Sequence, residues 1–130
     1  MPHYCSMNSA GAPIIYIVDD DDVVRDSLRA LLEVRQYQVC DFESGDHFLD
    51  RLDLANGCVI LDVHMPGLPG TEVLRQLRER GATIPVILIT GRRDSQIEAQ
   101  ASAFGAIALI DKPLSHAKLF SAIEQALQLS

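Results

Sequence analysis

The stretch "CVILDVHMPGLPG" (residues 58–70) places one carboxylate, Asp62, between a run of apolar residues and a loop rich in proline and glycine. The apolar run before Asp62 is typical of a buried strand. Burying a carboxylate without a partner at the end of such a strand costs on the order of several kcal/mol. Asp62 therefore either caps the turn that follows or is held at this position for its chemistry.

Four more apolar runs occur along the chain, and each gap between runs is long enough for the crossover helix that parallel strands require. The pattern predicts an α/β fold, namely a flavodoxin-like, doubly wound (βα)5 domain with helices on both faces of the sheet. Its five-stranded parallel sheet has the order 2-1-3-4-5, which makes the first run central and the second an edge strand. The runs are "IIYIV" (14–18), "YQVCDF" (37–42), "CVIL" (58–61), "VILIT" (86–90) and "AIALI" (106–110).

The segments between the runs carry apolar side chains at helical spacing. Within the acidic run "DDDD" (19–22), we expect Asp21 or Asp22 to cap the first helix, because its carboxylate can accept hydrogen bonds from free backbone amides. The apolar positions of the five expected helices are Val24, Leu28, Leu31 and Leu32; Phe48, Leu49 and Leu52; Val73, Leu74 and Leu77; Ile97, Ala101 and Phe104; Phe120, Ile123 and Leu127.

The composition is that of one soluble globular domain, with 130 residues, 48% hydrophobic and 22% charged. The net charge of -7 argues against direct binding to nucleic acid or to an anionic membrane, because phosphate contacts need clustered Lys and Arg. The chain start has neither a basic leader nor an apolar core, so we predict no signal peptide and a cytoplasmic protein. Cys40 and Cys58 lie inside apolar runs, which predicts buried, reduced thiols.

Polar side chains stand at the ends of four of the five runs. Asp19 and Asp20 follow the first run, Asp62 follows the third, Thr90 ends the fourth, and Lys112 comes just after the fifth. Each has an ordinary structural interpretation when taken singly, such as a strand-end cap, a β-branched strand residue or a solvated surface charge. Because ligands in doubly wound sheets bind beyond the carboxyl ends of the strands, their joint placement predicts one pocket.

Three carboxylates in one pocket require positive charge. Two like charges about 4 Å apart repel by about 4 kcal/mol at an effective dielectric constant of about 20. Lys112 supplies one counter-charge, and a divalent cation would supply the rest; ligation by oxygen alone favours Mg²⁺ over zinc. A cation and a lysine around an accessible aspartate suit phosphoryl transfer to its carboxylate, with Thr90 placed to donate a hydrogen bond.

The segments "IVDDDDVVR", "LDVHMPGLPG", "LITG" and "DKP" resemble, in order and spacing, the signature of the response-regulator receiver domain of two-component signalling. The resemblance extends over residues 14–128 and leaves residues 1–13 as an expected flexible N-terminal tail. The "IPVILITG" run is most similar to receivers that precede a helix-turn-helix DNA-binding output domain. No such domain is present in this sequence, so the chain is expected to be a stand-alone regulator or an excised receiver.

The resemblance implies that Asp62 accepts a phosphoryl group from the phosphohistidine of a sensor histidine kinase or phosphotransfer protein. It implies that Asp19, Asp20, Asp62 and the backbone carbonyl of His64 hold Mg²⁺. Thr90 and Lys112 would contact the phosphoryl group, and the Lys112–Pro113 peptide bond would be cis. Phosphorylation would switch the face formed by the fourth helix, fifth strand and fifth helix for partner binding or dimerisation. The chain would then be a signalling domain that promotes only its own phosphorylation and dephosphorylation, not an enzyme.

Two departures from the family pattern bear on this interpretation. Leu109 stands where the family usually carries a tyrosine or phenylalanine that takes part in the switch. His64 and Arg92 occupy positions that tune the lifetime of the phosphoryl group in the family, and we hypothesise that both shield it from water.

Three other functions remain as alternatives. A receiver-fold scaffold could signal without phosphorylation. A phosphatase of the haloacid-dehalogenase type would need a second aspartate two residues after the nucleophile, where this chain has His64. A flavodoxin-like electron carrier would place a cofactor phosphate next to the "DDDD" run, which would repel it.

Overall fold

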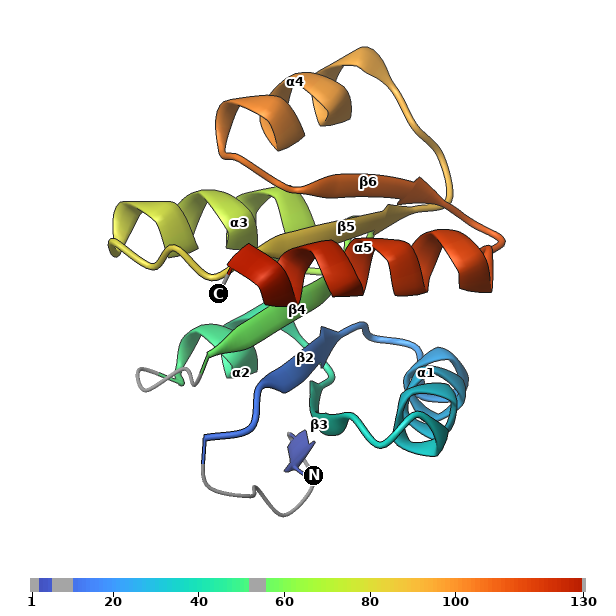
Figure 1. Ribbon diagram of the computed structural model, residues 1–130. Helices are drawn as coiled ribbons and strands as arrows, with labels where there is room; N and C mark the ends of the chain where they lie inside the picture. Colours follow the sequence, from blue (N-terminus) through green and yellow to red (C-terminus); the bar gives the residue numbers. More distant parts are fainter. Residues whose placement is uncertain (1–2, 6–10, 52–55, 130) are drawn as a thin grey trace.

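The computed structural model describes residues 3–5, 11–51 and 56–129. Strands and helices alternate along the chain after the first strand (Figure 1). The elements are β1 (His3–Cys5), β2 (Ile14–Val18), α1 (Asp22–Val34), β3 (Gln38–Phe42), α2 (Gly45–Leu49), β4 (Gly57–Asp62), α3 (Gly70–Glu79), β5 (Val86–Thr90), α4 (Ser95–Ala103), β6 (Ala108–Asp111) and α5 (His116–Leu129).

The described strands form one sheet in the order β1-β3-β2-β4-β5-β6. The five strands β3, β2, β4, β5 and β6 are mutually parallel and confirm the predicted order 2-1-3-4-5. The prediction that the second apolar run is an edge strand is wrong, because β1 pairs antiparallel with β3 and covers that edge. β1 consists of three residues from the segment that we expected to be a flexible tail; the rest of residues 1–10 lie outside the described part of the chain.

Helices cover both faces of the sheet (Figure 1). On one face, α1 and α5 pack against alternate strand residues such as Ile15 and Ile17. On the other face, α2, α3 and α4 pack against the intervening residues, such as Tyr16 and Val18. Burial on both sides explains why the strand runs are apolar without alternation.

The start of α1 is fixed by a carboxylate of the acidic run. Asp21 is the N-cap, and its Oδ1 accepts hydrogen bonds from the backbone amides of Val23 and Val24 at 2.9 and 3.3 Å. This confirms a capping role within the run, and it leaves Asp19 and Asp20 outside the helix. Of the predicted apolar helix positions, only Leu52 lies outside the described residues.

The loop after β4 returns tightly to the strand end. The Gly70 amide donates a hydrogen bond to the Val63 carbonyl at 2.9 Å. A Cβ at Gly70 would lie 2.2 Å from the Asp62 carbonyl oxygen, which is far inside van der Waals contact. Only glycine therefore lets α3 begin this close to Asp62.

The two cysteines inside the apolar runs differ. Cys58 is a buried free thiol, as predicted, and burial raises its pKa to about 12. Cys40 is disulfide-bonded, so the prediction of a reduced thiol is wrong at that position. None of the helices in the described part of the chain is long and apolar enough to cross a membrane.

Candidate functional site

The carboxyl ends of four parallel strands bring the predicted polar residues to one edge of the sheet. β2 leads into Asp19 and Asp20, β4 ends at Asp62, and β5 ends at Thr90. The strand register keeps these ends level, with Asp62 opposite Ile89 and the last residue of β5 opposite a residue of β6. Asp19 and Asp62, which are 43 positions apart in the sequence, are thereby neighbours in space.

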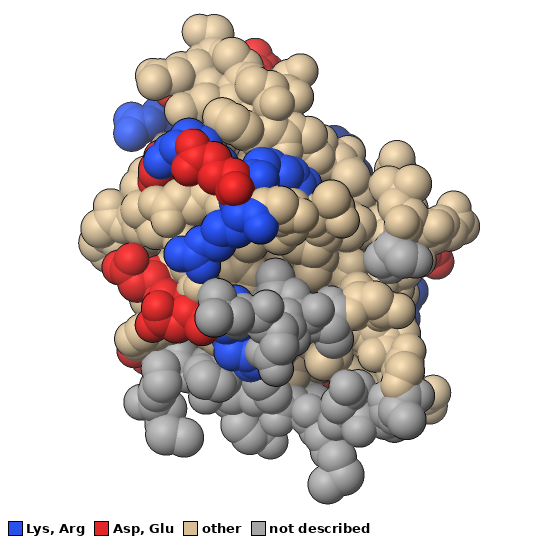
Figure 2. Space-filling view, turned by 90° about the vertical axis from the view of Figure 1, so that its left-hand side faces the viewer, with Lys and Arg blue, Asp and Glu red and all other residues tan. Residues whose placement is uncertain are grey.

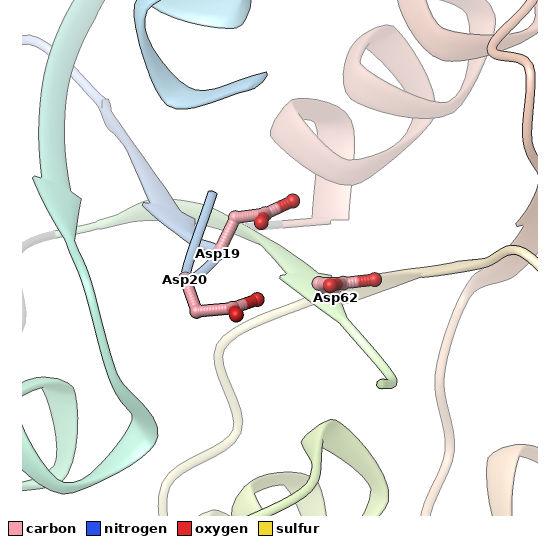
Figure 3. A group of neighbouring side chains, drawn as sticks. All are labelled: Asp19, Asp20 and Asp62. Atoms are coloured by element: carbon pink, nitrogen blue, oxygen red, sulfur yellow. The ribbon is translucent and has the colours of Figure 1, made fainter. Parts of the chain in front are cut away.

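The three carboxylates form a compact cluster. One oxygen from each of Asp19, Asp20 and Asp62 lies within 4.8 Å of the others. Figure 3 shows the Asp19 and Asp20 side chains extending from the end of β2 toward the side on which Asp62 lies. Asp19 and Asp62 are buried, with 3% and 4% of their surface exposed, whereas Asp20 is exposed. The cluster therefore opens to solvent on the Asp20 side.

Burial makes two of these carboxylates costly to ionise. The pKa of Asp19 is raised from 3.8 to about 6, chiefly by loss of hydration and also by the nearby Asp62 charge, while a hydrogen bond from the Asp21 amide opposes this rise. Burial also raises the pKa of Asp62, although the Lys112 ammonium and the His64 backbone amide oppose this. The described residues thus leave the site short of positive charge.

Lys112 reaches the cluster from the segment after β6. Its Nζ lies 3.3 Å from Asp62 Oδ1, and its side chain is 34% exposed while that of Asp62 is 4% exposed. The nearby ammonium lowers the Asp62 pKa, and apart from this ion pair Oδ1 has no hydrogen-bond partner among the described residues. The Lys112–Pro113 peptide bond is cis, which confirms that prediction.

These features fit a hard divalent cation. All the donors are carboxylate oxygens, two of them have raised pKa values, and one buried oxygen lacks a hydrogen bond. Mg²⁺ prefers oxygen ligands and retains several waters, which the open Asp20 side permits. The backbone carbonyl of His64 stays a predicted fourth protein ligand.

Thr90 lies fully buried at the rim of the site and is already engaged. Its hydroxyl donates to the Arg92 carbonyl oxygen at 3.0 Å, and the Arg92 amide donates back to Oγ1 at 3.1 Å. The ring nitrogen Nε2 of His64 lies 3.0 Å from the same oxygen. Thr90 therefore occupies the predicted position with a hydroxyl that must turn before it can meet a group on Asp62.

Sequence reasoning missed two contacts that shape the site. Arg25 donates from Nη1 to the Asp19 carbonyl oxygen at 2.7 Å and pairs with Asp22, so α1 is tied to the end of β2. The only signal was the spacing of three residues between Asp22 and Arg25 on one helix face. The contact of the His64 ring with Thr90 joins two loops and had no local signal.

Comparison with known proteins matches residues 15–124 to the family model described as "Response regulator receiver domain". The transcriptional regulatory protein FixJ of Bradyrhizobium diazoefficiens is 37% identical over 115 residues, which are 88% of this chain and 56% of that protein. The response regulator protein TmoT of Ectopseudomonas mendocina is 42% identical over 118 residues, 90% of this chain and 54% of that protein. The chain thus spans about half the length of these relatives.

Solved structures agree with the observed architecture. The response regulator StyR superposes with a TM-score of 0.85 at 38% identity, covering 91% of this chain and 60% of that one. The structure described as FixJ-N superposes with a TM-score of 0.83 at 34% identity, covering 94% of this chain and 96% of that one. With the family model, the relatives and the fold in agreement, the chain belongs to the response-regulator receiver domain family.

Proposed function

We propose that this chain is a phosphoacceptor signalling domain in which Asp62 takes a phosphoryl group from the phosphohistidine of a sensor histidine kinase or phosphotransfer protein. One observation carries the proposal: a buried carboxylate, Asp62, lies within 4.8 Å of two others and 3.3 Å from Lys112, with an oxygen that has no hydrogen-bond partner among the described residues. A buried aspartate with a merely structural role would have hydrogen-bond partners for both carboxylate oxygens.

The transfer needs only a nucleophile and positioned charge. A carboxylate oxygen of Asp62 attacks phosphorus and forms a P–O bond, while the P–N bond of the donor breaks and its electron pair stays on the imidazole nitrogen, which then takes up a proton. Lys112 sits where it can pair with a phosphoryl oxygen. Thr90 supplies a hydrogen bond to another phosphoryl oxygen after it leaves the Arg92 carbonyl.

Asp19, Asp20, Asp62 and the His64 carbonyl would hold Mg²⁺. When bound, the cation neutralises charge on the phosphoryl oxygens. Asp20 is exposed, so the cluster is open to solvent on its side, and the tight turn at Gly70 holds the end of β4 that carries Asp62.

The signal would leave the site through the loop after β5. Arg93 follows the Thr90 turn and donates from Nη2 to the Leu109 carbonyl oxygen at 2.8 Å, and it pairs with Asp111 at 3.2 Å. It also reaches α4 through Glu98 at 3.3 Å. We infer that movement of this loop shifts the face formed by α4, β6 and α5 for partner binding or dimerisation, although Leu109 lacks an aromatic ring.

This proposal places the chain in the cytoplasm and makes it a signalling domain that promotes only its own phosphorylation and dephosphorylation. His64, two residues after Asp62, is not the aspartate that a haloacid-dehalogenase-type phosphatase needs. A scaffold that works without phosphate would not need the buried, charge-deficient cluster around Asp62. Sustained hydrolysis of a small phosphoester would favour the phosphatase instead.

The test treats the chain with acetyl phosphate and Mg²⁺ and measures its intact mass. We expect a gain of one phosphoryl group that disappears when a chelator removes Mg²⁺ and in Asp62→Asn. Asp26→Asn, a change of the same kind at an exposed position on α1, is the matched control and should be modified like the unchanged chain. No adduct in the unchanged chain, or an adduct that persists in Asp62→Asn, would contradict the proposal.

A further inference from the structure

The imidazole of His64 contacts the one hydroxyl that the proposed transfer requires. His64 Nε2 lies 3.0 Å from Thr90 Oγ1 and 3.4 Å from the Arg92 carbonyl oxygen. The His64 side chain belongs to the loop after β4, whereas Thr90 ends β5. The contact therefore connects the loop that follows Asp62 to the Thr90 hydroxyl at the end of β5.

The hydrogen-bond donors around Thr90 Oγ1 can be counted. The hydroxyl hydrogen goes to the Arg92 carbonyl, and the Arg92 amide donates to Oγ1. Every contact is satisfied if His64 Nε2 carries a hydrogen and donates it to Oγ1, with the Arg92 carbonyl as a weaker second acceptor. Thr90 then donates one hydrogen bond and accepts two, which saturates its hydroxyl.

A saturated hydroxyl resists turning. To donate to a phosphoryl group on Asp62, the Thr90 hydroxyl must leave the Arg92 carbonyl, and Oγ1 must also loosen its hold on two N–H donors. One of these donors is the Arg92 backbone amide, which every substitution except proline keeps. The other is the side chain of His64, which is exposed and can be changed without disturbing the core.

We propose that His64 is a positioning residue that holds the Thr90 hydroxyl in its resting arrangement and thereby slows phosphoryl acceptance at Asp62. This inference rests on the proposed function, and it assigns His64 a role before transfer. The hypothesis that His64 shields the phosphoryl group from water assigns it a role after transfer. The two roles differ in which rate they change and in whether Thr90 is needed.

The test measures Mg²⁺-dependent acceptance from acetyl phosphate over a range of donor concentrations. Losing one neutral hydrogen bond corresponds to a change of about 2- to 10-fold in a rate. We expect His64→Ala to raise the maximal rate by about this factor and to leave the half-saturating donor concentration unchanged, because Thr90 acts on the transferring group. If His64 had only a structural role, its loss would not raise the maximal rate while leaving the half-saturating donor concentration unchanged.

Two conservative variants test whether the N–H at the Nε2 position is what matters. In His64→Gln the amide nitrogen is as many bonds from Cα as Nε2, so it can replace the donor, and the rate should return toward that of the unchanged chain. In His64→Asn the amide nitrogen is one bond short, and the rate should stay close to that of His64→Ala. The backbone carbonyl of residue 64 is present in every variant.

A second cycle tests whether His64 acts through Thr90. In a Thr90→Val background, which lacks the hydroxyl, His64→Ala should have no further effect on the rate; Thr90→Ala serves if the valine variant unfolds. The inference is overturned if His64→Ala accepts at or below the unchanged rate, or if it accelerates acceptance equally without the hydroxyl. Faster loss of a preformed adduct, with unchanged acceptance, would establish the shield instead. If the unchanged chain forms no Mg²⁺-dependent adduct, the proposed function itself fails.

Discussion

At the two ends of the sheet, ionisable side chains differ in how many hydrogen bonds they make. At the end where the parallel strands begin, the guanidinium of Arg78 donates to four backbone carbonyl oxygens, those of Phe104, Ala82, Ile84 and Gly105. At the end where the strands stop, Asp62 keeps a buried oxygen without a hydrogen bond among the described residues. Within the described part of the chain, the Arg78 guanidinium makes four hydrogen bonds to carbonyl oxygens, whereas Asp62 Oδ1 makes none.

The surfaces around the two ends match this difference. Figure 2 shows the end where the strands begin, with basic and acidic side chains interspersed. At the other end, three carboxylates lie close together (Figure 3), and Lys112 pairs with one of them, Asp62. The carboxylate cluster lacks positive charge, and this is the feature expected of a site that binds a cation.

The largest effect should follow from removing the lysine of the charge-deficient end. Lys112→Met keeps an apolar stem but removes the ammonium 3.3 Å from Asp62, so the Asp62 pKa should rise further. We expect Mg²⁺-dependent acceptance from acetyl phosphate to fall by about 100-fold, the loss typical of one positioned charge-stabilising group. Lys118→Met, an exposed lysine on α5, is the matched control. Equal rates in both variants would show that Lys112 is not part of the site.

The opposite end should respond in stability. Arg78→Met leaves four backbone carbonyl oxygens without the hydrogen bonds that they now accept. Partial burial of the guanidinium lowers its pKa. The free energy of unfolding should drop by about 1–3 kcal/mol in urea titrations. Arg75→Met on the same helix loses ion pairs that are partly exposed to solvent, and it should change stability less. A larger loss of stability in Arg75→Met than in Arg78→Met would contradict this difference between the two ends.

Asp19 should make the charge-deficient end sensitive to pH. Its folded pKa of about 6 lies above the ordinary 3.8, so between these values the folded chain binds more protons than the unfolded chain. The free energy of unfolding without Mg²⁺ should therefore fall as the pH rises from about 4 to about 6. Asp19→Asn should flatten this slope, because an amide does not titrate. The fold at this position should be kept, because the amide oxygen can still accept a hydrogen bond from the Asp21 amide.

The same variant tests the cation. Added Mg²⁺ should raise the melting temperature of the unchanged chain at pH 7, because a ligand that binds only the folded state stabilises it. In Asp19→Asn this rise should be much smaller, whereas Asp26→Asn should keep it. A rise of equal size in all three proteins would place the cation elsewhere.

The smallest expected effect concerns Arg93, which we propose transmits the change at the site to α4 and β6. Arg93→Ala removes solvent-exposed contacts to Leu109 and Asp111. Phosphoryl acceptance at Asp62 should therefore change little. Backbone hydrogen exchange in α4 and β6, compared before and after phosphorylation, should then show about half the change seen in the unchanged chain. An undiminished change would mean that the signal bypasses Arg93.

The sequence predicted the features that depend on regular pattern. Apolar runs and helical spacing were enough for the five parallel strands and their order, and the rule that parallel strands share a carboxyl edge brought Asp19, Asp62 and Lys112 together. β1 was not predicted, because a strand of three residues has no pattern to detect.

Contacts that depend on side-chain direction across loops also escaped prediction. His64 and Thr90 are 26 positions apart, and Arg78 reaches Phe104 across the same separation. Neither spacing corresponds to a helix face or a strand pair, so only the folded chain reveals these contacts. The disulfide of Cys40 likewise had no local signal.

Chemical trapping of the modified residue tests the account most directly. After treatment with acetyl phosphate and Mg²⁺, borohydride reduces an aspartyl phosphate to homoserine by releasing phosphate, and peptide mass spectrometry then locates the change. Homoserine at position 62, with Asp19 and Asp20 unaltered, is the predicted result. A modified Asp19 or Asp20, or a phosphoryl group on a histidine with Asp62 intact, would contradict the account.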